Sequence, residues 1–334
     1  MRWWSKQSAY AGQAGAANDD DKEEDDMTAT NARTSSRTTP MLFSRQRQLL
    51  QLLDALGGTA GKLDFQKLLF LYCQKQSANA PYDFVPYKFG AFSFTSYADC
   101  RKLVAHGLLE DDDGWRLTDA GRKVIGRTPD LQLSAFARSH RLRGDELVVD
   151  TYRRFPFFAT RSEIAERVLK GDKAALARIE MVRAARSKSA LHTIGYEGHS
   201  VESYLNELLQ NGITILCDVR RNPISRKYGF SKNALARICE NVGIRYEHLP
   251  ELGIASEQRQ GLDTQADYDA LFDDYERTWL PKQGTVLEKI RTWVGEKECV
   301  ALTCYEHAPN QCHRHCVAEA LEDRFGKDLS AKHL

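Results

Sequence analysis

Two apolar runs separated by an amphipathic segment, within residues 192–217, constrain the fold of this chain more than any other feature. The runs cover residues 192–196 and 213–217, and each has the length of a short strand. Between them, apolar residues in the segment 201–208 recur at the spacing of one helix face, and the Asn-Gly pair at 211–212 is typical of a helix end. A strand, a helix and a strand in this order form a βαβ unit, so we expect the two strands to be parallel.

The same kind of pattern continues towards the carboxyl end of the chain. Residues 244–249 and 299–304 are further strand candidates, while residues 286–294 and 314–325 have the apolar spacing of helices. We therefore predict an α/β domain over residues 191–330, with a mostly parallel sheet and helices on both faces.

The amino-terminal half has a different pattern. We expect residues 1–40 to be a disordered acidic tail, because they carry few large apolar side chains. Residues 41–130 favour a mainly helical, winged-helix-like module, in which two short strands joined by an acidic turn follow the helices. Residues 131–190 are predicted to form a helical connector whose basic face could track phosphates, although a solvated charged helix explains the pattern about as well.

Composition narrows the class of protein. The 47 Lys and Arg residues nearly balance the 46 Asp and Glu residues, so the local basic stretch at 220–227 matters more than the net charge of +1. Six of the eight cysteines show no pairing pattern, which indicates a reducing compartment. Neither a membrane-length apolar run nor a signal peptide is evident, so we expect a cytoplasmic protein without a membrane partner. Phosphate-binding glycine motifs are also missing, which argues against an NTPase or a dinucleotide enzyme.

Polar residues follow the predicted strands at the points where the strands end. In an open parallel sheet, ligands bind at the carboxyl ends of the strands. These ends supply Tyr196 and Glu197, then Asp218, Arg220, Arg221 and Asn222, then His248 and Glu251, and finally Tyr305, Glu306, His313 and Arg314. We therefore expect these side chains to gather at one edge of the sheet and to form a site there.

Four ordered motifs in residues 191–325 carry a resemblance to a known family. They are Thr193-Ile194-Gly195; Asp218-Val219-Arg220 with Pro223, Ser225-Arg226 and Gly229-Phe230; His248-Leu249-Pro250-Glu251-Leu252-Gly253; and Cys304-Tyr305-Glu306 with Cys312-His313-Arg314. Together they resemble the DUF488 family. The function of that family was long unassigned, so the resemblance implies a fold more firmly than an activity.

The amino-terminal half carries a second resemblance. Its motifs are Phe65-Gln66-Lys67-Leu68-Leu69, Lys88-Phe89-Gly90 and the segment from Trp115 to Gly121, which resemble the Panacea, or SocA-antitoxin-like, domain. Such domains are similar to modules that bind DNA or partner proteins. The combination of the two domains resembles bacterial anti-phage DNA glycosylases. It implies a DNA glycosylase that releases a modified base from double-stranded phage DNA in antiviral defence and leaves abasic sites, with glucosylated hydroxymethylcytosine as one candidate base.

Cleavage of an N-glycosidic bond passes through a sugar with oxocarbenium character and needs a carboxylate near the anomeric carbon. Asp218 is the leading candidate because it ends a buried strand, and Asn222 and Glu306 are the other candidate catalytic residues. An extruded base also needs aromatic and polar walls, and the flanking phosphates need basic groups. The candidate residues for these contacts are Tyr196, Glu197, Arg220, Arg221, Arg226, Lys227, Tyr246, His248, Tyr305, His313 and Arg314.

Several alternatives stay open at this point. Asp218 could form only a structural ion pair with Arg220 or Arg314. The chain could be a non-catalytic DNA-binding regulator, or a nuclease that uses a divalent metal. The sequence does not indicate an oligomeric state.

The cysteines and histidines in residues 304–316 raise two further alternatives. Such a cluster could bind zinc, and Cys312 beside His313 could act as a cysteine nucleophile. We nevertheless expect neither a metal nor another cofactor, because Cys304 lies in an apolar strand and the family motif supplies only the triplet Cys312-His313-Arg314.

Overall fold

The computed structural model describes residues 41–76, 79–183 and 190–334. The predicted disordered tail, residues 1–40, lies outside the described residues. The chain forms two compact units. The described part of the first comprises residues 41–76, 79–82 and Ser96–Gly144, and the second comprises Asp83–Thr95 and the described residues from Asp145 to Leu334.

The first unit is mainly helical, as predicted. Its helices are α2 (Ser44–Ala55), α3 (Lys62–Gln76), α4 (Phe94–Ala105), α5 (Asp119–Ile125) and α6 (Leu131–Ser139), and its antiparallel strands are β1 (Thr59–Ala60), β4 (Leu109–Asp111) and β5 (Trp115–Leu117) in the order β1-β5-β4. The hairpin of β4 and β5 around the acidic turn is confirmed. The Thr118 hydroxyl accepts a hydrogen bond from the backbone N–H of Gly121, and this cap starts α5 directly after the hairpin.

The second unit begins with a small antiparallel pair and several short helices. The elements are β2 (Val85–Tyr87), β3 (Gly90–Phe92), α7 (Gly144–Arg154), the 3-10 helix η4 (Pro156–Ala159), α8 (Ala165–Val168) and α9 (Lys173–Arg183). The end of the segment Asp83–Thr95 is held within this unit by Glu202 of helix α10 (Val201–Gln210). The Glu202 carboxylate accepts hydrogen bonds from the backbone N–H of Thr95 at 2.7 Å and from the Ser93 hydroxyl at 3.2 Å.

A five-stranded parallel sheet forms the centre of the second unit, which confirms the predicted α/β fold. Its strands are β6 (Leu191–Gly195), β7 (Ile215–Asp218), β8 (Arg245–His248), β9 (Val300–Cys304) and β10 (Lys332–His333), in the order β10-β6-β9-β7-β8. Every pairing within it is parallel. The register aligns the strand ends: Asp218 lies opposite His248 on one side and Thr303 on the other, and Gly195 lies opposite Cys304.

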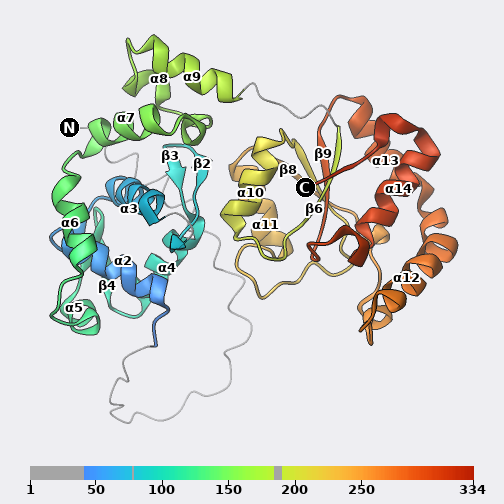
Figure 1. Cartoon of the computed structure of the whole chain (residues 1–334), viewed down its shortest axis with the longest axis horizontal. Helices are drawn as coiled ribbons and strands as arrows, with labels where there is room; N and C mark the ends of the chain where they lie inside the picture. Colours follow the sequence, from blue (N-terminus) through green and yellow to red (C-terminus); the bar gives the residue numbers. More distant parts are fainter. Residues whose placement is uncertain (1–40, 77–78, 184–189) are drawn as a thin grey trace, which may run out of the picture. The chain divides into compact units, whose positions relative to one another are not determined.

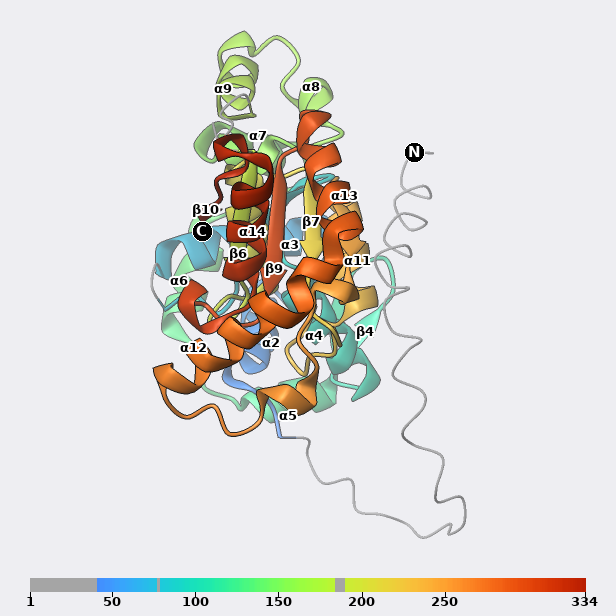
Figure 2. The same cartoon turned by 90° about the vertical axis from the view of Figure 1, so that its right-hand side faces the viewer.

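Helices cover both faces of this sheet, as Figure 1 shows. Helices α10 and α11 (Lys232–Asn241) pack on one face, where Leu216 and Ala301 are buried. Helices α12 (Gln265–Asp274), α13 (Gly284–Gly295) and α14 (Arg314–Phe325) pack on the other, over Cys217 and Leu302, and lie in front of the strands in Figure 2. Because side chains alternate along a strand, Asp218 lies on the α10–α11 face and Cys304 on the α12–α14 face.

Short helical turns join the larger elements of the second unit. They are the 3-10 helices η5 (Pro250–Leu252), η6 (Ser256–Arg259), η8 (Leu280–Gln283), η9 (Pro309–Gln311) and η10 (Lys327–Leu329), and the π-helical turn η7 (Tyr275–Trp279). Among the described residues, no helix combines the length and the apolar character needed to cross a bilayer.

Candidate active site

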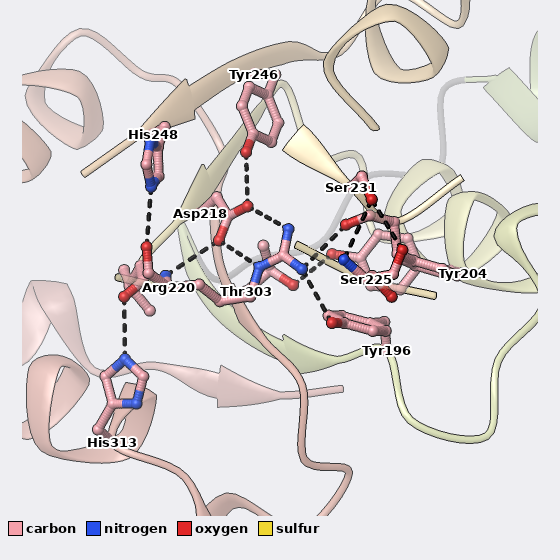
Figure 3. Close-up of polar contacts among 12 residues, drawn as sticks. Tyr196, Tyr204, Asp218, Arg220, Ser225, Ser231, Tyr246, His248, Thr303 and His313 are labelled. Atoms are coloured by element: carbon pink, nitrogen blue, oxygen red, sulfur yellow. Dashed lines mark hydrogen bonds and ion pairs between the residues drawn. The ribbon is translucent and has the colours of Figure 1, made fainter. Parts of the chain in front are cut away.

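Asp218, at the end of β7, is fully buried and has both carboxylate oxygens occupied by hydrogen bonds. Oδ1 accepts from the backbone N–H and the Nε of Arg220 at 3.1 and 2.8 Å. Oδ2 accepts from Arg220 Nη2 and from the Tyr246 hydroxyl, both at 2.6 Å (Figure 3). These contacts favour the structural ion pair over a carboxylate that is free to meet a substrate.

Arg220 extends this network to an aromatic cluster. Its Nη1 donates to the Tyr196 hydroxyl at 2.9 Å and to the carbonyl of Phe230 at 3.0 Å (Figure 3). The rings of Tyr196 and Phe230 stack with their centroids 4.4 Å apart. Burial acts to lower the pKa of Arg220, but the hydrogen bonds and charge of Asp218 outweigh it, so the pKa is raised and the guanidinium stays charged. Asp218 thus positions Arg220, and Arg220 positions Tyr196.

A pocket of about 380 Å³ opens beside this network at the carboxyl edge of the sheet. It is lined by Tyr196, Arg220, Arg221, Asn222, Ile224, Ser225, Arg226, Ile254, Arg259, Cys304, Tyr305, Glu306 and His313. Among these lining residues Glu306 supplies the carboxylate, and Asp218 is not one of them. The volume lies in the range of ~300–1,000 Å³ that is usual for small-molecule sites.

Glu306 lies in the loop after β9, with its side chain 12% exposed. Its Oε1 pairs with the guanidinium of Arg259, and its Oε2 lies 3.5 Å from the sulfur of Cys304. Burial raises the pKa of Glu306, followed by the charge of Cys312, while Arg259 acts in the opposite direction; the net shift is upward. The pocket therefore presents one partly desolvated carboxylate beside an arginine.

The backbone around Glu306 is held in place from two sides. Arg314, which is fully buried, donates from Nη1 to the carbonyl of Glu306 at 2.5 Å and from Nη2 to the carbonyl of His307 at 2.8 Å. Gly195 lies so close that a Cβ at this position would come within 1.8 Å of the Glu306 carbonyl oxygen. Arg314 therefore holds the loop in place and does not line the pocket.

Cys304, Cys312 and His313 lie together, and Cys304 and His313 line the pocket. All three are buried, and one ligand atom from each lies within 4.8 Å of the other two. Cys304 Sγ is 3.9 Å from His313 Nδ1, and His313 Nε2 is 3.0 Å from the carbonyl of Val219. Burial opposes ionisation of Cys312, but its hydrogen bonds with Cys304 and His313 outweigh burial, and the pKa of this thiol is held well below its usual value. The hydrogen bond that Cys304 donates to Cys312, followed by burial, raises the pKa of Cys304.

Four other predicted site residues lie near the pocket without lining it. Tyr246 donates to Asp218, and burial followed by the charge of Asp218 raises the pKa of its hydroxyl. His248 Nε2 lies 2.9 Å from the Arg220 carbonyl, and Lys227 donates from Nζ to the Tyr196 carbonyl at 3.0 Å. Glu197 accepts a hydrogen bond from the backbone N–H of His307 at 3.0 Å. Their contacts are with the protein itself.

The remaining predicted residues line the pocket or its mouth. Tyr305 is 45% exposed and meets Tyr196 edge-on, with ring centroids 5.3 Å apart. Arg221, Asn222 and Arg226 are exposed residues of the loop that follows β7. This loop gives the mouth of the pocket a basic character.

Arg259 is a charged pocket residue that the sequence did not indicate. It ends the 3-10 helix η6, in a segment without helix or strand periodicity, and reaches Glu306 from 47 positions earlier in the chain. No local pattern marks such a contact. Cys304 belongs to the Cys/His cluster noted in the sequence. Its apolar neighbours in β9 gave no sign that its own side chain lines the pocket.

Comparison with known proteins identifies one domain. Residues 200–321 match the model of a family described as "Domain of unknown function DUF488". The match falls within the segment for which the sequence motifs predicted this family. Searches of curated proteins and of solved structures found no match.

Proposed function

We propose that the pocket in the DUF488 domain hydrolyses the N-glycosidic bond of a modified base in double-stranded DNA and leaves an abasic site. The observation that carries the proposal is the partly desolvated Glu306 carboxylate in a pocket that also has an aromatic wall and a basic mouth. In this proposal Glu306 takes the role for which Asp218 was the leading candidate, because Glu306 lines the pocket whereas Asp218 is fully buried beside Arg220 and Tyr246.

The proposed hydrolysis forms one bond at C1′ of the deoxyribose and breaks another. A water oxygen forms a bond to C1′ of the deoxyribose while the bond from C1′ to the base nitrogen breaks. The electron pair of that bond leaves with the base, and the water proton passes to the Glu306 carboxylate and then to the departing base. A carboxylate near C1′ also stabilises the oxocarbenium character of the sugar, which is the costly part of the reaction.

The substrate must reach the pocket as an extruded nucleotide, because C1′ and the base edge are inaccessible within a stacked duplex. Tyr305 and Tyr196 offer an aromatic wall for the flipped base. Arg221 and Arg226 at the mouth would contact the phosphates on either side of it. Asn222, which is exposed between them in the sequence, would hydrogen-bond the base edge or hold the water.

The biological setting belongs to the same proposal and rests on the resemblance of the sequence to anti-phage glycosylases. The substrate would be phage DNA with modified cytosines, glucosylated hydroxymethylcytosine among them, met in the cytoplasm during infection. The helical first unit, with its hairpin of β4 and β5, would act as a module that binds DNA or a partner protein.

The decisive experiment compares Glu306→Gln with Glu251→Gln, whose side chain is exposed and does not line the pocket. Both variants and the wild type are incubated with modified and plain phage DNA, and released bases are measured by mass spectrometry. We expect Glu306→Gln to lose base release by roughly 10²–10⁴-fold, the usual contribution of a general base, while Glu251→Gln retains it.

Alkali treatment of the same DNA separates the proposal from a nuclease. Abasic sites break only after alkali, whereas a nuclease cuts the strand directly. Strand breaks without alkali, or base release that survives in Glu306→Gln, would contradict the proposal.

A further inference from the structure

Three side chains that can bind a metal come together from two parts of the chain, and two of them, Cys304 and His313, line the pocket. Cys304 ends β9, and Cys312 and His313 immediately precede α14. The two sulfurs and one imidazole nitrogen all lie within 4.8 Å of one another, and all three residues are buried. Thiolate and imidazole are the ligands that Zn²⁺ takes most often in proteins.

The hydrogen bond of His313 fixes which of its nitrogens is available. Nε2 lies 3.0 Å from the carbonyl oxygen of Val219. A carbonyl only accepts, so Nε2 carries the hydrogen and Nδ1 keeps its lone pair. That lone pair belongs to the nitrogen on the Cys304 side, 3.9 Å from its sulfur. A histidine that donates one ring N–H to a backbone carbonyl while the other nitrogen faces further ligands is the usual arrangement at a metal site.

The spacing also suits a tetrahedral ion. With Zn–S near 2.3 Å and Zn–N near 2.1 Å, a sulfur and a nitrogen on one zinc lie about 3.6 Å apart. The observed 3.9 Å between Cys304 Sγ and His313 Nδ1 requires a shift of only a few tenths of an ångström. We propose that Cys304, Cys312 and His313 bind one Zn²⁺ ion beside the pocket.

The fourth coordination position of this ion would face the pocket, because Cys304 and His313 both line it. Glu306, with Oε2 at 3.5 Å from Cys304 Sγ, is the nearest carboxylate to that position. Three protein ligands and one open position are typical of catalytic rather than structural zinc sites. The ion would hold a water molecule or a heteroatom of the bound ligand there. This inference concerns what these three residues bind, and it does not depend on the proposed glycosylase activity.

A second group, formed by Glu276 of η7 with His315 and Cys316 of α14, provides a matched control. Glu276, His315 and Cys316 also place their ligand atoms within 4.8 Å of one another, but this group offers a single sulfur and includes an exposed carboxylate. Cys316 is buried in α14, three residues beyond His313. Cys316→Ser therefore removes a buried thiol of α14 and leaves the three proposed ligands unchanged.

The test measures metal in the full-length protein, purified under a thiol reductant and without a chelator. We expect about one zinc ion per chain by elemental mass spectrometry. Cys304→Ser and Cys312→Ser should lose it and Cys316→Ser should keep it. Replacement of zinc by Co²⁺ should give thiolate-to-cobalt charge-transfer absorption in the wild type and in Cys316→Ser. The two ligand variants should lack that absorption while retaining the circular dichroism of the folded chain.

Two results would overturn the inference: wild-type protein that neither contains zinc nor binds added Zn²⁺, or metal that follows Cys316 instead of Cys304 and Cys312. Should a ligand variant fail to fold, the wild type alone answers the question, through removal of zinc by a chelator, its return by added Zn²⁺, and Co²⁺ absorption. Because metal content is read separately from base release, a zinc-loaded protein that releases no base would refute the glycosylase proposal and leave the zinc site standing.

Discussion

At the scale of single residues, Asp218 and Glu306 lie at one sheet edge but differ in their surroundings. Asp218 is on the α10–α11 face, where Arg220 and Tyr246 saturate it within a buried network. Glu306 follows β9 in a loop and extends into the pocket beside Arg259. A buried charge is stable only while its partner is present, so Asp218 and Arg220 act as one structural unit.

Asp218→Asn should therefore destabilise the fold, since it leaves the Arg220 guanidinium buried without its counter-charge. We expect a loss of roughly 3–5 kcal/mol in the free energy of unfolding, measured by chemical denaturation. The double variant Asp218→Asn with Arg220→Met removes both charges and should recover much of that loss. If Asp218→Asn unfolds like the wild type yet abolishes base release, the aspartate is catalytic and its structural role is refuted.

At the scale of elements, the end of β6 determines where Glu306 can lie. Gly195 has no side chain, and any Cβ there would meet the Glu306 carbonyl oxygen at 1.8 Å. The constraint is one of space, because the β9 loop crosses directly over the glycine. A strand-ending glycine in the sequence thus marks close approach of another backbone as well as a strand end.

Gly195→Ala should displace the loop that carries Glu306. We expect a loss of about 1–3 kcal/mol in stability from overpacking, together with reduced base release. Gly295→Ala is the control, since a Cβ at the end of α13 meets nothing within 4 Å. Thermal unfolding and the base-release assay on both variants check this, and equal behaviour of the two would refute the close approach.

Glu202, near the start of α10, links that helix to Ser93 and Thr95 at the end of the segment Asp83–Thr95. It is fully buried, and burial raises its pKa to about 7 from an ordinary value of 4.5. The folded chain therefore keeps this proton up to about pH 7, whereas the unfolded chain loses it near pH 4.5. The contribution of Glu202 to stability is full below pH 4.5 and falls as the pH rises to 7.

Glu202→Gln should flatten this dependence and make the chain more stable than the wild type above pH 7, by roughly 3 kcal/mol at most. Denaturant unfolding between pH 4.5 and pH 8 measures it. The amide keeps the shape of the side chain and an acceptor for the Thr95 N–H. Parallel pH profiles for the two proteins would show that Glu202 is not the titrating group.

The sequence predicted elements whose signal is local and missed those that depend on distant partners. The βαβ unit and the strands β8 and β9 follow from apolar runs and helix spacing, and they are confirmed. Strand β10 could not be predicted, because Lys332 and His333 carry no strand pattern and become a strand only by pairing with β6. Helix α11, in contrast, has Leu235, Ile238 and Cys239 on one face and was detectable.

The same limit applies to the site. The rule that ligands bind at strand ends grouped Tyr196, Arg220, Tyr305 and Glu306, and all four line the pocket. The rule does not determine the face of the sheet on which each side chain lies. Asp218 was therefore predicted to be the catalytic carboxylate, a role that its contacts do not favour. The insertion of Asp83–Thr95 into the second unit rests on buried hydrogen bonds to Glu202, and no periodicity reveals these.

At the scale of the whole molecule, ion pairs neutralise part of the basic charge of the chain. The net charge is +1, so attraction to a polyanion must be local. Four arginines of helices α7 to α9 are neutralised by ion pairs. The pairs are Arg153 with Asp172, Arg154 with Asp150, Arg167 with Asp145 and Arg183 with Glu180. Arg221 and Arg226 at the pocket mouth take part in no ion pair among the described residues. Under the proposed function, we therefore expect phosphates to contact the mouth rather than these four ion-paired arginines.

Salt dependence of DNA binding distinguishes these two surfaces. Each phosphate contact contributes about −0.9 to the slope of log K against log salt concentration for duplex DNA. The double variant Arg221→Gln with Arg226→Gln should therefore lower the magnitude of that slope by roughly 1.8 if both residues contact phosphates. Arg153→Gln with Arg167→Gln removes the same charge from ion-paired positions and should leave the slope nearly unchanged. Fluorescence anisotropy with a labelled duplex from 50 to 200 mM salt, a range over which such slopes are resolved, measures both variants. A slope that falls for the helix pair and not for the mouth pair would move the DNA contact to the connector and separate it from the pocket.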